Sequence, residues 1–402
     1  MSGKMEYVTC TAPVNIAVIK YWGKRDEKLV LPMNSSVSVT LSQDQLRAKT
    51  TIAACKTFSN DKIWLNGREE SFDNPRIQNL LHEVKCRARI QNGSDLDQLL
   101  SWKIHICSEN NFPTAAGLAS SAAGYACLAF TLAQLYKVTG DVSDIARRGS
   151  GSACRSVYGG FVVWNKGENI DGTDSIARQI LPHTHWSDLH ILILVVSDQK
   201  KHTGSSEGMQ KTVQTSELYK QRVKCVPERT DDIIDAIKNK DFDKFAEITM
   251  KDSNQLHAVC LDTYPPISYL TDTSRDIMTL VHRYNTFKAQ NKVAYTFDAG
   301  PNACLYLNEA DVPGVISIIE YFFPPTSQSQ HFITGLPINT RAIEKEFISN
   351  VTIPIQPDGL KYVIHTTVGD GPRVCTNEDS LLDRSGEPIS PIAEKRNIDS
   401  VL

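Results

Sequence analysis

The sequence predicts an α+β protein built from two lobes. The chain has 402 residues, and a domain usually takes ~100–200 residues. Segments with strand-like and helix-like patterns alternate before residue 190, and mostly helical patterns follow. We therefore place one lobe at residues 1–189 and a second α/β lobe at residues 190–402.

The first lobe is expected to begin with strands. β-branched residues that alternate with polar ones predict strands at residues 7–11 and 36–41. Residues 75–89 carry apolar side chains at helical spacing, with proline at the start, which predicts a helix. The other elements expected here are strands at 62–65, 102–107, 161–164 and 189–196, helices at 120–135 and 141–148, and an exposed loop at 91–98.

The second lobe is expected to be richer in helices. Its apolar spacing predicts helices at residues 206–223, 231–239, 242–261, 269–287 and near 315–322. A strand–turn–strand unit is predicted from 292 to 307, with its turn at 298–302, and a late strand at 361–366.

Composition and charge exclude several classes of function. Lys+Arg 43 against Asp+Glu 46 leaves a formal charge of −3, so no bulk positive charge favours nucleic acid or an acidic membrane. The longest apolar run, at residues 191–196, is far short of the ~20 needed to span a bilayer. The ten cysteines include no Cys-x-x-Cys pair, so a zinc ribbon or a thioredoxin-type site is not expected, and we assign no residue as a metal ligand. With no secretory pattern at residues 1–10, we expect a soluble cytoplasmic protein with free thiols.

The most informative motif is Pro-Thr-Ala-Ala-Gly-Leu-Ala-Ser-Ser-Ala at residues 113–122. A loop of small residues that enters a helix exposes backbone N–H groups beside the positive end of the helix dipole, and both bind phosphate. Ser120 and Ser121 add hydroxyls for phosphate oxygens or a metal ion. The alternative is an ordinary loop with a serine that caps a tightly packed helix.

Two further motifs offer cations and donors to an anion. Residues 15–24 carry Lys20 and Lys24 around Tyr21 and Trp22, a set that could line a phosphate pocket. The alternative is an amphipathic segment with solvated lysines. Residues 147–155 contain Gly-Ser-Gly-Ser before Arg155, which could hold a carboxylate or phosphate bidentately. The alternative is a glycine-rich turn with a surface arginine.

The fourth motif is Asp-Ala-Gly-Pro-Asn at residues 298–302. A carboxylate on a rigid turn can act as a general base or orient a hydroxyl nucleophile. The alternative is a tight turn without chemistry.

In this order, the four segments resemble those of the mevalonate diphosphate decarboxylases of animals and fungi, a family of the GHMP kinase superfamily. The resemblance extends from about residue 9 to about residue 371. It implies a two-lobed GHMP-kinase-type fold, with a ribosomal-S5-domain-2-like N-terminal lobe, a C-terminal ferredoxin-like lobe and the active site in the cleft. It also implies a homodimer that converts (R)-mevalonate 5-diphosphate, with ATP and Mg²⁺, to isopentenyl diphosphate for isoprenoid and sterol synthesis.

The resemblance also assigns roles to individual residues. It implies that Asp298, Arg155, Lys20 and Ser121 are catalytic, with Asp298 on the C3 hydroxyl and Arg155 on the substrate carboxylate. It implies substrate contacts by Asn15, Tyr21, Trp22, Gly23, Lys24, Arg76, Ser150, Gly151, Ser152, Ala153, Cys154, Arg155 and Ser206. It implies contacts with the ATP phosphates by Gly117, Leu118, Ala119, Ser120 and Ser121. The alternatives are a GHMP-type kinase of a related alcohol, which releases no CO₂, and a non-catalytic ligand sensor on the same fold.

Overall fold

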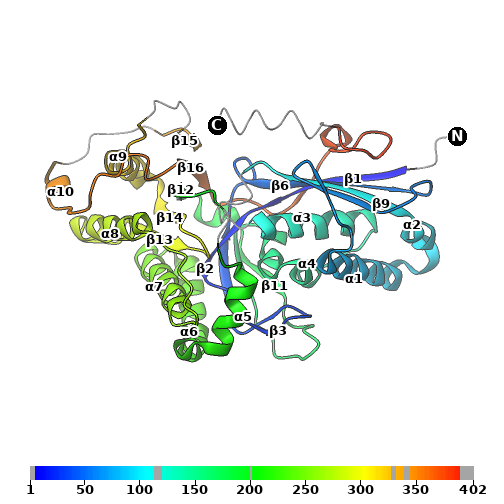
Figure 1. Ribbon diagram of the computed structural model, residues 1–402, viewed down its shortest axis with the longest axis horizontal. Helices are drawn as coiled ribbons and strands as arrows, with labels where there is room; N and C mark the ends of the chain where they lie inside the picture. Colours follow the sequence, from blue (N-terminus) through cyan, green and yellow to red (C-terminus); the bar gives the residue numbers. More distant parts are fainter. Residues whose placement is uncertain (1–4, 113–119, 200–201, 327–331, 339–344, 390–402) are drawn as a thin grey trace.

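The computed structural model describes residues 5–112, 120–199, 202–326, 332–338 and 345–389. It has the expected α+β architecture, with helices packed on several mainly antiparallel sheets (Figure 1). The strands are β1 (Met5–Pro13), β2 (Asn15–Ile19), β3 (Lys24–Asp26), β4 (Leu31–Pro32), β5 (Ser36–Thr40), β6 (Arg47–Cys55), β7 (Lys62–Leu65), β8 (Arg68–Glu70), β9 (Lys103–Asn110), β10 (Phe161–Trp164), β11 (Ala177–Leu181), β12 (Leu189–Val195), β13 (Val293–Phe297), β14 (Ala303–Asn308), β15 (Ile333–Gly335), β16 (Tyr362–Thr367) and β17 (Arg373–Val374).

The helices divide between the two halves of the chain. In the part that the structure describes, they are α1 (Pro75–Asn92), α2 (Asp97–Ser101), α3 (Ser120–Leu135), α4 (Ser143–Gly149), α5 (Ser205–Thr215), α6 (Glu217–Asn239), α7 (Phe242–Leu261), α8 (Asp272–Phe287), α9 (Val312–Phe322) and α10 (Lys345–Ser349).

The first half is built around a six-stranded sheet with the order β17-β1-β6-β9-β7-β8. Helix α3 packs on β1 and β6, and α1 and α4 lie beside it on the same face (Figure 1). Ala122, Ala126, Ala129 and Ala133 of α3 are all buried, and small side chains let a helix approach a sheet closely. The small side chains on this face of α3 therefore explain the close contact.

Two other sheets bring the halves of the chain together. The sheet β11-β10-β5-β2 belongs to the first half, and the sheet β13-β14-β12-β16-β15 belongs to the second. They meet where Leu41 bridges Val368 and where Ser42 donates its N–H to the carbonyl of Thr367 at 2.9 Å. One cluster of buried apolar residues runs through both halves, so the two lobes share a core.

The chain returns to its first sheet near its end. Strand β17 pairs with β1, with Cys10 opposite Val374. Beyond it, Leu382 is buried with Trp64 on the sheet, and the His105 ring lies 2.8 Å from the carbonyl of Gly386. Residues 375–389 therefore cover the face of this sheet that α3 leaves free.

The structure differs from the predicted elements in several places. Residues 91–98 are not an exposed loop, because α1 continues to Asn92 and two short helices follow that bury Leu96 and Leu100. The helix predicted at 206–223 is interrupted at Ser216, whose hydroxyl caps α6, and α6 then runs unbroken through Pro227. Strand β6 was not predicted at all, although it lies between β1 and β9.

Candidate active site

The site is organised around Lys20, which follows the fully buried strand β2. Its side chain is only 2% exposed, and Nζ donates to Oδ1 of Asp298 at 2.5 Å. The backbone of Lys20 is held from the other lobe: its N–H donates to Asp252 at 2.7 Å, and its carbonyl accepts from Arg222 at 3.0 Å. Lys20 and Asp298, each expected to be catalytic, thus form a direct ion pair between the two halves of the chain; their pairing was not predicted.

Asp298 follows β13, on a turn whose C-terminal end is held by hydrogen bonds. The Asn302 side chain accepts from the N–H of Ser197 and donates to its carbonyl, both at 2.9 Å. The Ser274 hydroxyl donates to the carbonyl of Pro301 at 2.8 Å. The Asp298 side chain itself stays 31% exposed, so a ligand can reach the carboxylate.

Arg155 lies in a short 3-10 helix, Gly151–Val157, and is 2% exposed. Its Nε donates to Oδ1 of Asn15 at 3.2 Å, and its guanidinium carbon lies 5.9 Å from the centre of the Trp164 ring. Burial lowers the pKa of Arg155, and the nearby charge of Asp298 partly offsets this. One nitrogen, Nη1, is buried without a hydrogen-bond partner among the residues that the structure describes. A buried donor of this kind needs an acceptor, and an anionic ligand would supply one.

The loop before Arg155 is packed on Tyr21 and Asn15. A Cβ added to Gly151 would lie 2.7 Å from the Tyr21 ring, so no side chain fits there. Asn15 donates to the carbonyl of Ser152 at 3.1 Å. Burial raises the pKa of Cys154 to about 12, which excludes this thiol as a nucleophile at neutral pH. Of the other loop residues, Ser150 is half-buried and Ala153 is buried.

Trp22 and Gly23 contact the helices α5 and α6. The Trp22 indole donates to Thr212 at 3.1 Å, and its carbonyl accepts from the Tyr219 hydroxyl at 2.5 Å. Gly23 has a φ of +89°, and a Cβ there would lie 2.0 Å from the same hydroxyl. Both positions therefore shape the segment after Lys20 by contact with α5 and α6.

Arg76 and Lys24, two other predicted substrate-binding cations, have different partners. Arg76, exposed at the start of α1, donates to the Ser206 hydroxyl on α5 at 3.0 Å, so these two predicted substrate residues do come together. Lys24 is paired with Glu27 at 2.6 Å, and its side chain is 7% exposed. Its charge is thus already balanced by a neighbour.

The predicted phosphate loop is described only in part. Ser120 and Ser121 begin α3, and Ser121 is exposed there. Gly117, Leu118 and Ala119 lie outside the described residues. In the described part, no group of three or more His, Cys, Asp or Glu side chains could hold a metal ion. A magnesium ion that arrives with a nucleotide keeps water and phosphate oxygens as most of its ligands, so it needs few ligands from the protein. The exposed Ser121 hydroxyl would supply one of them.

Sequence reasoning missed the residues of α6 and α7 that hold the site. Asp252 and Arg222 are both fully buried and hydrogen-bond at 2.9 Å beside the backbone of Lys20. His257 lies near Lys20 and Asp298, whose charges act on it. These residues stand in helices whose sequence pattern is that of ordinary amphipathic helices. The one sign of their role in the sequence was a charged residue at a position that the helical pattern predicts to be buried.

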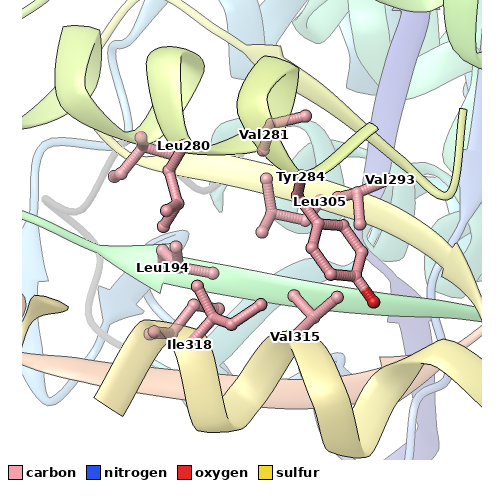
Figure 2. Close-up of a pocket in the computed structure, with 10 residues that line it drawn as sticks. Leu194, Leu280, Val281, Tyr284, Val293, Leu305, Val315 and Ile318 are labelled. Carbon is pink, nitrogen blue, oxygen red and sulfur yellow. The ribbon is translucent and has the colours of Figure 1, made fainter. Parts of the chain in front are cut away.

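A small cavity in the second half of the chain does not belong to this site. Figure 2 shows it between α8 and α9 over the sheet, with aliphatic side chains pointing inward. Its volume is about 20 Å³, close to one water molecule, and an apolar space of that size stays dry. It is a packing space without a polar group to orient a ligand.

Two family models together match nearly the whole chain. Residues 12–177 match the model of the diphosphomevalonate decarboxylase-like N-terminal domain. Residues 191–375 match the model of the mevalonate 5-diphosphate decarboxylase C-terminal domain.

Individual relatives agree with these models. The chain is 57% identical to a diphosphomevalonate decarboxylase from Rattus norvegicus, over 95% of this chain and 96% of the relative. The corresponding human protein is 55% identical, over 91% and 93%. Among solved structures, mevalonate diphosphate decarboxylase from Trypanosoma brucei superposes with a TM-score of 0.88 at 38% identity, over 94% of this chain and 100% of that one. A structure described as MDDEF in complex with MVAPP, AMPPCP and magnesium has a TM-score of 0.73 at 31% identity, over 93% and 100%.

Proposed function

The chain belongs to the diphosphomevalonate decarboxylase family, and on that premise we propose how its site performs the reaction. The enzyme converts (R)-mevalonate 5-diphosphate and ATP to isopentenyl diphosphate, ADP, phosphate and CO₂. One observation carries the proposal: Asp298, from the second half of the chain, is paired with Lys20 of the first half, and its charge also acts on the buried Arg155.

The first step is transfer of the γ-phosphoryl group of ATP to the C3 hydroxyl, since a tertiary hydroxyl is a poor leaving group. Asp298 orients this hydroxyl and accepts its proton as the oxygen attacks phosphorus. The Lys20 ammonium, 2.5 Å from Asp298, holds the carboxylate in place and offsets the charge of two polyanionic substrates. Magnesium bound with ATP would neutralise part of the phosphate charge, and the Ser121 hydroxyl would lie nearest to it.

The second step removes phosphate and CO₂. The C3–O bond breaks with its electrons on the leaving phosphate, and the bond to the carboxyl carbon supplies the pair for the new double bond. Arg155 holds the substrate carboxylate in line for this cleavage. Its buried Nη1, which has no acceptor within the described part of the chain, supports that role.

The remaining contacts follow from the same arrangement. We propose that Arg76 and Ser206 bind the substrate diphosphate, which their mutual contact at 3.0 Å supports. The loop Ser150, Gly151, Ser152, Ala153 and Cys154, with Asn15 and Tyr21, encloses the substrate. Trp22, Gly23 and Lys24 complete this wall. Gly117, Leu118, Ala119, Ser120 and Ser121 bind the ATP phosphates.

The setting of the enzyme is also a proposal. We place the lobes at residues 1–189 and 190–402, which the gap between the two matched models supports.

We propose a cytoplasmic homodimer in isoprenoid and sterol synthesis. All ten cysteines are free thiols, as in a reducing compartment. None of the helices within the described ranges is long and apolar enough to cross a membrane. Light scattering after gel filtration tests the dimer.

One assay tests the reaction. The protein is incubated with ATP, Mg²⁺ and mevalonate 5-diphosphate labelled at the carboxyl carbon. Labelled CO₂ and ADP should appear in equal amounts. ADP with all label retained in a phosphorylated acid would instead identify a kinase, and binding without ADP would identify a sensor.

A further inference from the structure

We propose that Trp164 is a positioning residue for the reaction, whose ring holds Arg155 and Tyr21 in place without neutralising the charge of Arg155. The inference rests on the proposed function and adds a residue that none of the four motifs contains. Trp164 ends β10 and is 0% exposed. Its backbone lies between two neighbouring strands, opposite Ala177 of β11 and Ser36 of β5, so the ring starts from a fixed point of the sheet.

The orientation of the indole is set by a hydrogen bond. Nε1 of Trp164 donates to the Ser175 hydroxyl at 3.1 Å, and that hydroxyl donates in turn to the carbonyl of Asn165 at 3.1 Å. Ser175 is itself 0% exposed. Turning the ring would leave the buried indole N–H without this acceptor, which costs free energy.

Two residues assigned to the substrate lie against this ring. The centre of the Tyr21 ring is 4.7 Å from that of Trp164, with the two planes tilted by 59°. The guanidinium carbon of Arg155 is 5.9 Å from the centre of the same indole, within the range of a cation–π contact. Tyr21 follows β2, whereas Arg155 lies in the 3-10 helix Gly151–Val157. The indole is therefore a contact that two separate segments of the site share.

Trp164 supports Arg155 without occupying the groups that a ligand needs. Asn15 accepts from Nε of Arg155 at 3.2 Å. Within the described ranges, no carboxylate forms an ion pair with this guanidinium, and neither its Nη1 nor the buried Tyr21 hydroxyl has a hydrogen-bond partner. A carboxylate in place of the ring would compete with an anionic substrate for the arginine. The face of an aromatic ring attracts the cation and leaves its N–H groups free.

The test compares Trp164→Phe with Trp164→Leu. Phenylalanine keeps an aromatic face for the guanidinium, whereas leucine keeps only apolar volume. For Trp164→Leu, kcat for CO₂ release should fall about 10- to 100-fold, as small misplacements of reacting groups do. Trp164→Phe should stay within about fivefold of wild type, because a weaker cation–π contact remains. All rates are compared below the melting temperature of each variant.

A double-mutant cycle with Arg155→Gln separates positioning from a general loss of packing. If the ring acts through Arg155, removing it matters little once the guanidinium is gone. Trp164→Leu should then lower kcat less than about threefold in the Arg155→Gln protein. A purely structural role predicts the same factor in both backgrounds. Equal factors overturn the proposal, as do wild-type kcat in Trp164→Leu and equal loss in the phenylalanine and leucine variants.

If Trp164→Leu does not fold, Ser175→Ala takes its place in the cycle. Loss of the acceptor of the indole N–H should lower kcat about three- to tenfold in the wild-type background. In the Arg155→Gln protein the same change should lower kcat less than about twofold. A normal kcat in Ser175→Ala, or equal factors in the two backgrounds, rejects the proposal.

Trp64→Leu is the matched control. Trp64 is also a buried tryptophan, 4% exposed, with the cation of Lys62 5.5 Å from its ring centre. It packs with Leu382 rather than with Arg155, so kcat should stay unchanged. A loss as large as that in Trp164→Leu would trace the effect to packing in general and reject the proposal. Wild-type enzyme that releases no CO₂ would instead reject the proposed function.

Discussion

Asp298 is partly exposed, whereas the cation that pairs with it is buried. Its carboxylate is 31% exposed, while its partner Lys20 is 2% exposed. The carboxylate can therefore meet a hydroxyl from the solvent side while a buried cation holds it. Asp298 can therefore orient the C3 hydroxyl and accept its proton during phosphoryl transfer.

Asp298→Asn tests this role. The amide cannot accept the hydroxyl proton, so kcat should fall about 100- to 10,000-fold. The amide keeps the size of the carboxylate, so Kd values for both substrates should change little. Steady-state kinetics and calorimetry measure the two quantities. A rate near that of wild type would falsify the assignment.

Arg155→Gln tests the carboxylate clamp. A charge-assisted hydrogen bond contributes about 1.5–3 kcal/mol, so turnover should fall about 10- to 150-fold. ADP and labelled CO₂ are measured in the same sample. If ADP forms at the normal rate while CO₂ release slows, Arg155 acts only after phosphoryl transfer; unchanged formation of both products contradicts any role.

His257 should make stability depend on pH. The ring has a pKa of about 4 in the folded protein, below its ordinary 6.5, so the unfolded chain binds more protons between these values. The free energy of unfolding therefore falls as the pH drops from 6.5 towards 4. Between pH 7.5 and 5.0, wild type should lose about 2 kcal/mol more than His257→Asn. Urea unfolding of both proteins measures this difference, and parallel pH profiles would contradict it.

Helix α7 connects the two halves of the site through a buried charge. Burial acts to raise the pKa of Asp252, but Arg222 and further hydrogen bonds lower it overall. Arg222 is 0% exposed and depends on this carboxylate. Removing either partner of this buried ion pair therefore costs a large free energy.

Asp252→Asn should destabilise the protein strongly. It leaves the buried Arg222 charge without its counter-ion, which costs about 3–5 kcal/mol. Asp232→Asn is the control, because its pair with Lys244 is exposed and contributes less than about 1 kcal/mol. Chemical denaturation measures both. Equal small losses would mean that water or another group already balances Arg222.

In the whole molecule, the end of the chain stabilises its beginning. Leu382 is 2% exposed in a cluster with Trp64 on the first sheet. Leu382→Ala should lower the free energy of unfolding by about 2–4 kcal/mol and leave kcat unchanged below the melting temperature. Leu261→Ala, at a position 56% exposed, should change stability by less than about 0.5 kcal/mol. Thermal unfolding compares them, and similar effects in both would show that residues 375–389 add little.

Local patterns predicted most elements because side-chain periodicity follows the secondary structure directly. The strands around Val37 and Val163 and the helices around Ala126 and Leu256 are where the patterns placed them. The break at Ser216 was missed because a single serine cap is a weak local signal.

The sequence by itself indicated the family, because four short contiguous motifs occur in an order that resembles that family, although each motif alone also fits an ordinary loop or turn. Only the tertiary structure decided which groups touch. Lys20 and Asp298 are 278 residues apart, and Asp252 and His257 sit in an ordinary helix pattern. A contact between distant residues leaves no trace in local periodicity, since it arises only when two elements pack.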